Sequence, residues 1–145
     1  MAITRYNPRT IWLGGNAGSP QTEVNDIPAG EEITPGMLIE RVAGEYVTHV
    51  TAGGKGTTFA LDQNFLNKDY DEVYAEGDLV WAGVGKSGHN YLAWLQSGEN
   101  VTDGAELQSA GNGMLEPASA GTGSFRALED KNTTTGDARI RVEVV

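Results

Sequence analysis

Two segments of the chain, residues 29–39 and residues 97–107, are near copies of each other. Each carries glycine, glutamate, threonine and glycine at the same offsets, with Ile33 or Val101 at the centre. Two glycines around a β-branched residue are typical of a tight turn, a short extended stretch and a second turn into a strand. The motif contains no pairing of a nucleophile with a base and no set of metal ligands. It therefore predicts a repeated piece of architecture, and a protein whose main property is its shape.

The repeat also predicts where the chain turns. Each copy is followed by another glycine-containing turn, at residues 43–45 in the first copy and residues 111–113 in the second, and then by an apolar pair. This arrangement is typical of a β-hairpin. The turns that we expect to define the fold lie at Gly30, Gly36, Gly77, Gly98 and Gly104.

Length and glycine content predict one mostly β domain. A chain of 145 residues is the size of a single domain, and its 20 glycines favour many short strands joined by turns. Residues 139–145 alternate charged and apolar side chains, as a half-buried strand does. Only residues 59–72 hint at a helix, of one or two turns at most; the alternative is a loop that leans on the core through Phe59 and Phe65.

The first 23 residues differ from the rest. Residues 1–20 contain Arg5 and Arg9 and no acidic residue, whereas the whole chain has a net charge of -10. Ordering such a segment costs backbone entropy that a few apolar side chains offset poorly when they lie on their own domain. We therefore expect residues 1–23 to be an extended arm and residues 24–145 to be the body; the alternative is a first strand with a frayed end. The arm residues expected to contact a partner are Arg5, Tyr6, Arg9, Ile11, Trp12 and Leu13.

Charge and hydropathy argue against several classes of function. An acidic body repels nucleic acid, so we expect no DNA or RNA partner. No segment approaches the ~20 apolar residues of a membrane span, and the N-terminus lacks the apolar core of a signal peptide. The sequence thus predicts a soluble protein made in the cytoplasm, with no membrane partner.

The motifs that resemble chemical sites are incomplete. Gly85-Lys86-Ser87 lacks the earlier glycine of a phosphate loop, because Val80 stands at that position. His49 and His89 are the only histidines, and neither has ligand-like spacing to a second metal-binding residue. We also find no base placed beside a nucleophile. The prediction is a protein that is not an enzyme and has no metal or other cofactor.

The three tryptophans leave two interpretations open. Trp81 and Trp94 lie on expected strands, which favours packing in the core, and exposed rings would instead form a platform for stacking on sugars. Trp12 lies in the basic arm and is the favoured interface anchor, because tryptophan and arginine dominate binding hot spots.

Several short stretches resemble a known family. They are residues 59–62, 71–80, 97–107, 113–118, 125–129 and 139–142. Together they are similar to the small capsid decoration, or cement, proteins of tailed bacteriophages, especially those of long-tailed phages with Chi-like genomes. The resemblance covers most of the chain, although each motif is short, and the first 23 residues match none of them.

The resemblance implies a fold and a role. The fold would be a compact β-barrel-like domain of the β-tulip type. The role would be to bind the outer surface of the capsid and to cement neighbouring major capsid proteins against internal DNA pressure. The family also implies a homo-oligomer, with a trimer favoured, and a location on the outside of the virion. The alternative is a glycan-binding module for adhesion, and an accessory domain of a hydrolase is the third hypothesis.

Overall fold

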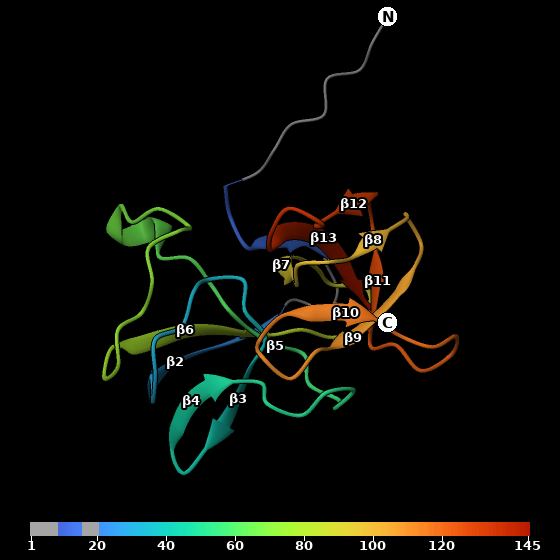
Figure 1. The fold of residues 1–145 in the computed structure, drawn as a ribbon. Coiled ribbons are helices and arrows are strands. Elements are labelled where there is room, and N and C mark those ends of the chain that lie inside the picture. Colours follow the sequence, from blue (N-terminus) through green and yellow to red (C-terminus); the bar gives the residue numbers. More distant parts are fainter. Residues whose placement is uncertain (1–8, 16–20) are drawn as a thin grey trace, which may run out of the picture.

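The computed structural model describes residues 9–15 and 21–145 and shows a mostly β domain built around a closed five-stranded barrel (Figure 1). The barrel strands are β7 (Asn90–Leu95), β9 (Glu106–Ser109), β10 (Leu115–Pro117), β11 (Phe125–Ala127) and β13 (Ala138–Val144). They are ordered β7-β10-β9-β11-β13, and the pairing of β13 with β7 closes the ring. The predicted mostly β, barrel-like fold with at most one short helix is confirmed.

β13 shows why this sequence closes into a barrel. Ile140 and Val142 are fully buried and point into the barrel, while Arg139 and Arg141 alternate with them on the outer face. β13 pairs with β11 along one edge and with the whole of β7 along the other. The alternation predicted for residues 139–145 is therefore the pattern of a strand with one face in the core.

Three smaller sheets and one added strand surround the barrel. β2 (Thr22–Pro28), β6 (Leu79–Val84) and β5 (Thr58–Ala60) form a three-stranded sheet in the order β2-β6-β5. β3 (Ile39–Val42) and β4 (Glu45–Thr48) form a hairpin that projects away from the barrel (Figure 1). β8 (Asn100–Val101) pairs with β12 (Lys131–Asn132), and β1 (Trp12–Gly14) pairs with β7.

The glycine repeat has the same backbone geometry in both copies. Gly36 and Gly104 both have positive φ, 96° and 90°, and both donate their N–H to a carbonyl of a neighbouring strand, at Ala60 and Ala127. In each copy the residue after the glycine bonds back to the threonine that opens the turn. Ile33 and Val101 lie in the core at the predicted positions. Each copy then enters a hairpin, β3–β4 in the first and β9–β10 in the second.

A third turn of the same kind follows Tyr74. Asp78 bonds back to Ala75, while Gly77, with φ 92°, donates its N–H to the carbonyl of Ala29. Tyr74 bridges directly to Ile33, so two of these turns lie beside each other. Gly30 differs from the other glycines that were predicted to define turns. Gly36, Gly77, Gly98 and Gly104 all have positive φ, and Gly30 does not.

Residues 59–72 form a strand end and a loop with little helix. β5 ends at Ala60, and one 3₁₀ turn, η1 (Asn64–Leu66), interrupts the loop. Phe59 is fully buried, but the ring of Phe65 is 59% exposed and packs on Trp81 at a centroid distance of 4.6 Å. The alternative of a loop leaning on the core therefore holds for Phe59 and is wrong for Phe65.

The structure corrects the predicted arm. Ile11 is fully buried in the barrel core, β1 pairs with β7, and β2 begins at Thr22, inside the segment assigned to the arm. Residues 9–14 therefore fold onto their own domain, and the alternative of a first strand describes residues 12–14. Arg5 and Tyr6 lie outside the described residues.

Candidate partner-binding groove

Two adjoining cavities lie on the outer side of the barrel, with volumes of about 330 Å³ and 310 Å³. They share Asp71 and Trp94, so we describe them together as the groove. The first cavity forms its charged end and includes Tyr70, Leu92, Glu129, Lys131, Arg139 and Arg141. The second forms its more apolar end and includes Met37, Val73 and Met114, with Asp137 at its edge.

The floor of the charged end is the outer face of the β7–β13 pair. Arg139 lies opposite Trp94 in the register, and Arg141 lies opposite Leu92. Directly opposed side chains project from the same face of a sheet, so these four side chains stand together outside the barrel. The same alternation that buries Ile140 and Val142 thus supplies the groove with its cations.

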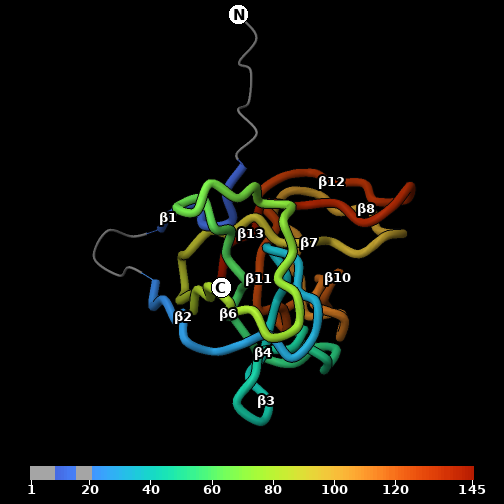
Figure 2. The backbone as a smooth tube through the Cα atoms, turned by 90° about the vertical axis from the view of Figure 1, so that its left-hand side faces the viewer, coloured from blue at the N-terminus to red at the C-terminus, as the bar shows by residue number. Residues whose placement is uncertain are grey.

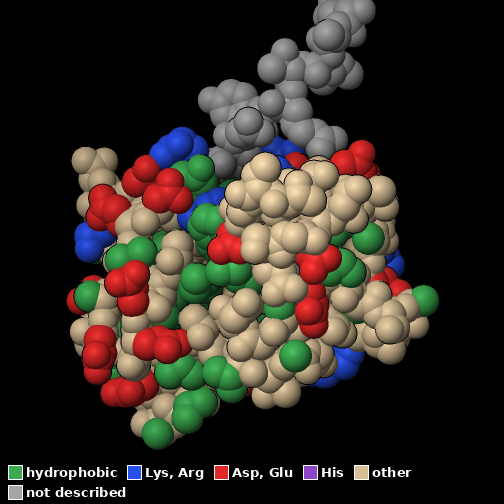
Figure 3. Space-filling model, viewed as in Figure 1, with side chains coloured by type: hydrophobic (Ala, Val, Ile, Leu, Met, Phe, Trp, Pro, Cys, Tyr) green, Lys and Arg blue, Asp and Glu red, His purple; other side chains and the backbone are tan. Residues whose placement is uncertain are grey.

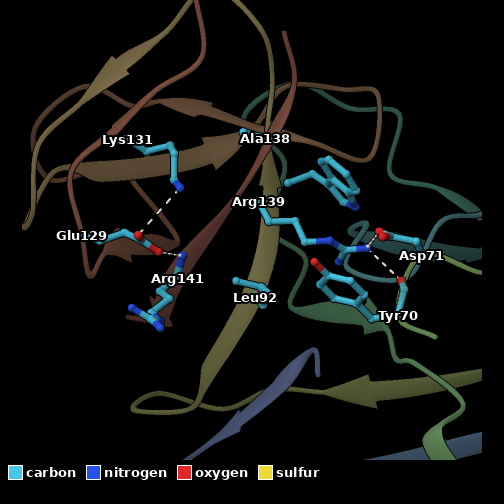
Figure 4. Close-up of a pocket in the computed structure, with 9 residues that line it drawn as sticks. Tyr70, Asp71, Leu92, Glu129, Lys131, Ala138, Arg139 and Arg141 are labelled. Atoms are coloured by element: carbon cyan, nitrogen blue, oxygen red, sulfur yellow. Dashed lines mark hydrogen bonds and ion pairs between the residues drawn. The ribbon is translucent and has the colours of Figure 1, made fainter. Parts of the chain in front are cut away.

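Arg139 ties the loop at residues 70–71 to this face (Figure 4). Its side chain is only 9% exposed, and its Nη1 and Nη2 atoms donate to the carbonyl oxygens of Pro35 and Tyr70 at 2.9 Å and 2.8 Å. The guanidinium also lies 4.2 Å from the ring centre of Tyr70 and 4.4 Å from that of Trp94. A planar cation that lies against two rings and donates hydrogen bonds to Pro35, Tyr70 and Asp71 holds one wall of the groove rigid.

The stack extends to the N-terminal segment. Arg9 lies 4.6 Å from the ring centre of Tyr70 and forms an ion pair with Asp69. Asp62, which is 8% exposed, accepts hydrogen bonds from the N–H of Ile11 at 2.8 Å and from the hydroxyl of Thr10 at 3.1 Å. These contacts fasten residues 9–11 to the loop that forms the groove wall.

At the opposite side of the charged end, Lys131 faces Glu129 (Figure 4). One oxygen of Glu129 accepts the backbone N–H of Arg141 at 2.9 Å, and the other lies 3.8 Å from the ammonium nitrogen of Lys131. That distance is an ion pair but is too long for a hydrogen bond. The ammonium group of Lys131, with 31% of its side chain exposed, is therefore placed to meet an anion that enters the groove.

The apolar end is lined by flexible side chains. Met37 and Met114 are half-buried, and Val73 is 45% exposed. Methionine side chains adapt to the shape of a partner and are frequent on binding surfaces. Figure 3 shows hydrophobic side chains gathered in a hollow on one face of the molecule, with acidic side chains spread around it.

The buried polar side chains serve the fold. His49 Nδ1 lies 2.7 Å from the hydroxyl of Ser109, and the hydroxyl of Thr133 donates to the carbonyl of Gln96 at 2.6 Å. His89 stacks edge-on against Trp12 and accepts the N–H of Lys86. Among residues 9–15 and 21–145, no group of three or more His, Cys, Asp or Glu side chains is arranged to hold a metal ion.

Two buried tyrosines are neutral hydrogen-bond donors. Burial raises the pKa of Tyr74 to about 12, and its hydroxyl donates to the carbonyl of Leu61 at 2.5 Å. Burial also raises the pKa of Tyr91, whose hydroxyl donates to the side-chain oxygen of Gln21 at 2.6 Å. The raised pKa keeps both hydroxyl groups protonated at neutral pH. This suits hydrogen bonds that hold the fold together, whereas a general base must give up its proton near neutral pH.

The structure places only some of the arm residues that were predicted to contact a partner, and it assigns one of them another role. Of the described arm residues, Ile11 belongs to the core, and Trp12 packs edge-on against Tyr91 at 5.3 Å. Arg9, Trp12 and Leu13 as partner contacts stay predictions. The groove itself was missed, since Tyr70, Met37 and Met114 lie far apart in the sequence. Only the alternation in β13 signalled that Arg139 and Arg141 face outward.

Each of the two strand tryptophans has a ring covered by its own chain. Arg139 lies over Trp94, whose Nε1 atom also donates to the carbonyl of Pro35 at 3.0 Å, and Phe65 lies against Trp81. Both tryptophans are half-buried. Neither prediction, full burial in the core or an open platform for sugars, therefore describes them.

Comparison with known proteins adds no assignment. No protein-family model matches the chain, and no curated protein matches it significantly. Within the part of the chain that the structure describes, no helix is both long enough and apolar enough to cross a membrane.

Proposed function

We propose that this protein is a structural head decoration protein of a tailed bacteriophage. In this role it binds the outer surface of the capsid and cements neighbouring major capsid proteins. The proposal starts from the family resemblance of the segments at 71–80, 97–107 and 139–142. Those segments contain two of the three glycine turns and the strand that closes the barrel, so the resemblance lies in parts that build the scaffold.

One observation carries the proposal: an open groove with a charged end and an apolar end is held on a rigid scaffold. Its wall is fixed by the bonds of Arg139 to Pro35 and Tyr70, and its floor is the outer face of the β7–β13 pair. The buried side chains of His49, Ser109 and Thr133 bond within the chain and do not line the groove. An arrangement of this kind supports recognition of a partner surface, and a capsid offers the same surface in many copies.

The acidic exterior suits a protein that must cover a shell and stay dispersed before it binds. With a net charge of -10, free copies repel one another over most of their surface. Attachment then depends on a defined contact, and the avidity of many contacts reinforces the shell even where each one is modest.

The direct test is binding of the purified protein to purified capsids of the phage that encodes it. We expect saturable occupancy, measured by co-sedimentation, with density for the chain on the outer surface in a cryo-EM reconstruction. Capsids carrying the protein should also withstand heating or chelator treatment better than bare capsids. No binding to expanded or unexpanded capsids would contradict the proposal.

The geometry favours the glycan-binding alternative less. A sugar ring stacks on an open aromatic face, but Trp94 lies under Arg139 and Trp81 lies against Phe65. A glycan array probed with the wild type and with Trp81→Ala and Trp94→Ala would decide between the two functions.

A further inference from the structure

The lining of the charged end reverses the charge balance of the chain. Acidic residues outnumber basic ones by 20 to 10 in the whole sequence. The first cavity is nevertheless lined by three cations and only two acids, which are Lys131, Arg139, Arg141, Asp71 and Glu129. A cavity with a surplus of one positive charge, in a protein that is otherwise acidic, favours a ligand that carries one negative charge.

Lys131 is the cation with unused donors. Its side chain is 31% exposed, and residues 9–15 and 21–145 offer its ammonium one partner, the carboxylate of Glu129 at 3.8 Å. Arg139, by contrast, already donates three hydrogen bonds within the chain. An ammonium has three N–H donors, so Lys131 can donate to an acceptor that enters the cavity. Figure 4 shows its side chain on the opposite side of the cavity from Tyr70.

The acids of the cavity limit the charge of the ligand. Glu129 lies beside Lys131, and Asp71 stands on the opposite wall with its side chain 60% exposed. A doubly charged phosphate would be repelled by both carboxylates, and none of the residues that line the cavity belongs to a helix whose N-terminus could hold it. A carboxylate carries a single charge and forms a strong hydrogen bond with an ammonium, so it is the anion that fits this cavity best.

The rest of the groove has the chemistry of a peptide site. Asp71 and Asp137 are exposed, and the described residues give each of them one hydrogen bond, which leaves acceptor positions for the N–H groups of a ligand. Beyond them, Met37 and Met114 offer an adaptable apolar surface. Figure 2 shows the loop of residues 61–78, which contains Asp71, running across the outside of the molecule, where a segment of another protein can reach it. A peptide supplies all three matching groups: a side-chain carboxylate, backbone N–H groups and an apolar side chain.

We propose that the groove binds an acidic segment of the partner protein, with a carboxylate side chain on the ammonium of Lys131 and an apolar side chain between Met37 and Met114. The inference rests on the proposed function, because it names the chemistry of the capsid segment that the groove holds. A single contact of this kind is weak and sensitive to salt, since the charge pair is partly exposed. A shell that repeats the segment many times compensates for that weakness.

The test titrates the purified full chain with short peptides. Each peptide contains one glutamate and one leucine separated by zero to three alanines, and acetyl and amide groups remove its terminal charges. The indole N–H of Trp94, which donates to Pro35 and lies at the junction of the two cavities, reports binding by NMR. We expect a saturable shift with a dissociation constant of about 1 mM, and binding about threefold or more weaker when glutamine replaces the glutamate.

Two variants of opposite sign separate anion binding from a purely structural effect. Lys131→Gln removes the cation and should raise the dissociation constant about threefold or more. Glu129→Gln removes the competing acid while its amide oxygen can still accept the N–H of Arg141, so it should lower the dissociation constant. Lys55→Gln is the matched control, because Lys55 bonds to Thr122 outside the groove and its loss should leave the dissociation constant unchanged. Circular dichroism verifies that each variant is folded.

Several results would overturn the proposal. They are a Trp94 resonance that no peptide shifts at about 10 mM, glutamine peptides that bind as well as glutamate peptides, or a Glu129→Gln variant that binds no more tightly than the wild type. The same variants are then measured for occupancy on purified capsids. Capsid binding that Lys131→Gln does not weaken would refute this contact and leave the decoration function standing. Peptide binding with the expected variant pattern, but no binding to capsids, would contradict the decoration function and leave the acidic-segment site standing.

Discussion

At the scale of single residues, Arg139 shows how one side chain joins distant parts of the chain. It contacts Pro35, Tyr70 and Trp94, which come from three separate segments. Lysine has a similar length and the same charge, but its ammonium cannot form the planar stack or reach the two carbonyl groups in a fixed fork.

We predict that Arg139→Lys lowers the free energy of unfolding by about 2 kcal/mol, because two hydrogen bonds and two ring contacts are lost or weakened. Urea denaturation followed by tryptophan fluorescence measures this loss. The control is Arg126→Lys, at an arginine that is 49% exposed and 3.7 Å from Glu143; it should change stability by about 0.5 kcal/mol or less. Equal effects of the two variants would contradict the structural role of Arg139.

The raised pKa of Tyr74 predicts how the stability of the fold changes at alkaline pH. Its pKa is raised from 10.0 to about 12 because it is buried, so the folded protein keeps this proton at a pH where the unfolded chain has lost it. The resulting stabilisation is fully present below pH 10 and is lost as the pH rises through the folded-state pKa.

We therefore expect Tyr74→Phe to be less stable than the wild type at neutral pH by about 1 kcal/mol, the typical worth of the lost hydrogen bond to Leu61. The gap should narrow between pH 10 and pH 12, because only the wild type loses the contribution of this tyrosine. Chemical denaturation at a series of pH values tests this, and a gap of constant size would refute the assignment.

At the scale of elements, the repeated glycine turn is the unit from which the fold is assembled. In three turns a glycine with positive φ donates its N–H to a neighbouring segment, so each turn both reverses the chain and ties two parts together. The surroundings of equivalent glycines differ. A Cβ on Gly36 would lie 2.8 Å from Nη1 of Arg139 and 2.9 Å from the carbonyl oxygen of Leu92, whereas a Cβ on Gly104 would have nothing within 4 Å.

This difference predicts unequal costs for the same substitution in the two copies. Gly104→Ala should cost about 1–2 kcal/mol, the strain of a left-handed conformation in an alanine. Gly36→Ala adds a clash with a packed arginine and a backbone oxygen and should cost about 1–3 kcal/mol more. Thermal and urea unfolding of the two variants side by side would measure the difference, and equal losses would show that the Arg139 contact yields freely.

The sequence predicted some elements well and others poorly. The hairpins after each repeat and the strand at 139–145 are predictable from the sequence, because turn glycines and strict alternation are local signals. The conformation of residues 59–72 is not predictable in this way, since the burial of Phe59 and the exposure of Phe65 depend on where β6 runs. Ile11 was misassigned for a similar reason, because its partners in the core come from the far end of the chain.

At the scale of the whole molecule, two hydrophobic clusters share their boundary. One fills the barrel, and the other lies between the β2-β6-β5 sheet and the β3–β4 hairpin. Trp81 packs against both clusters, while Phe59 and Ala60, adjacent in β5, belong to different ones. Because one strand serves both cores, neither can lose its packing without disturbing the other.

We predict one cooperative unfolding transition for the whole domain. Far-ultraviolet circular dichroism, which follows the strands, and tryptophan fluorescence, which follows Trp12, Trp81 and Trp94, should give coincident curves in urea. Two separated transitions, or a small-sheet cluster that unfolds first, would show that the clusters are independent.

The sequence by itself determined the class of fold, the repeated turns and the acidic exterior, because these follow from glycine positions, alternation and charge, which are local or additive properties. Only the tertiary structure decided that residues 9–14 belong to the body and that Tyr70, Trp94 and Arg139 meet beside Met37 and Met114 in one groove. The physical reason is barrel closure. It brings together side chains that are separated by most of the chain, and no local pattern specifies which of the possible partners will pack against them.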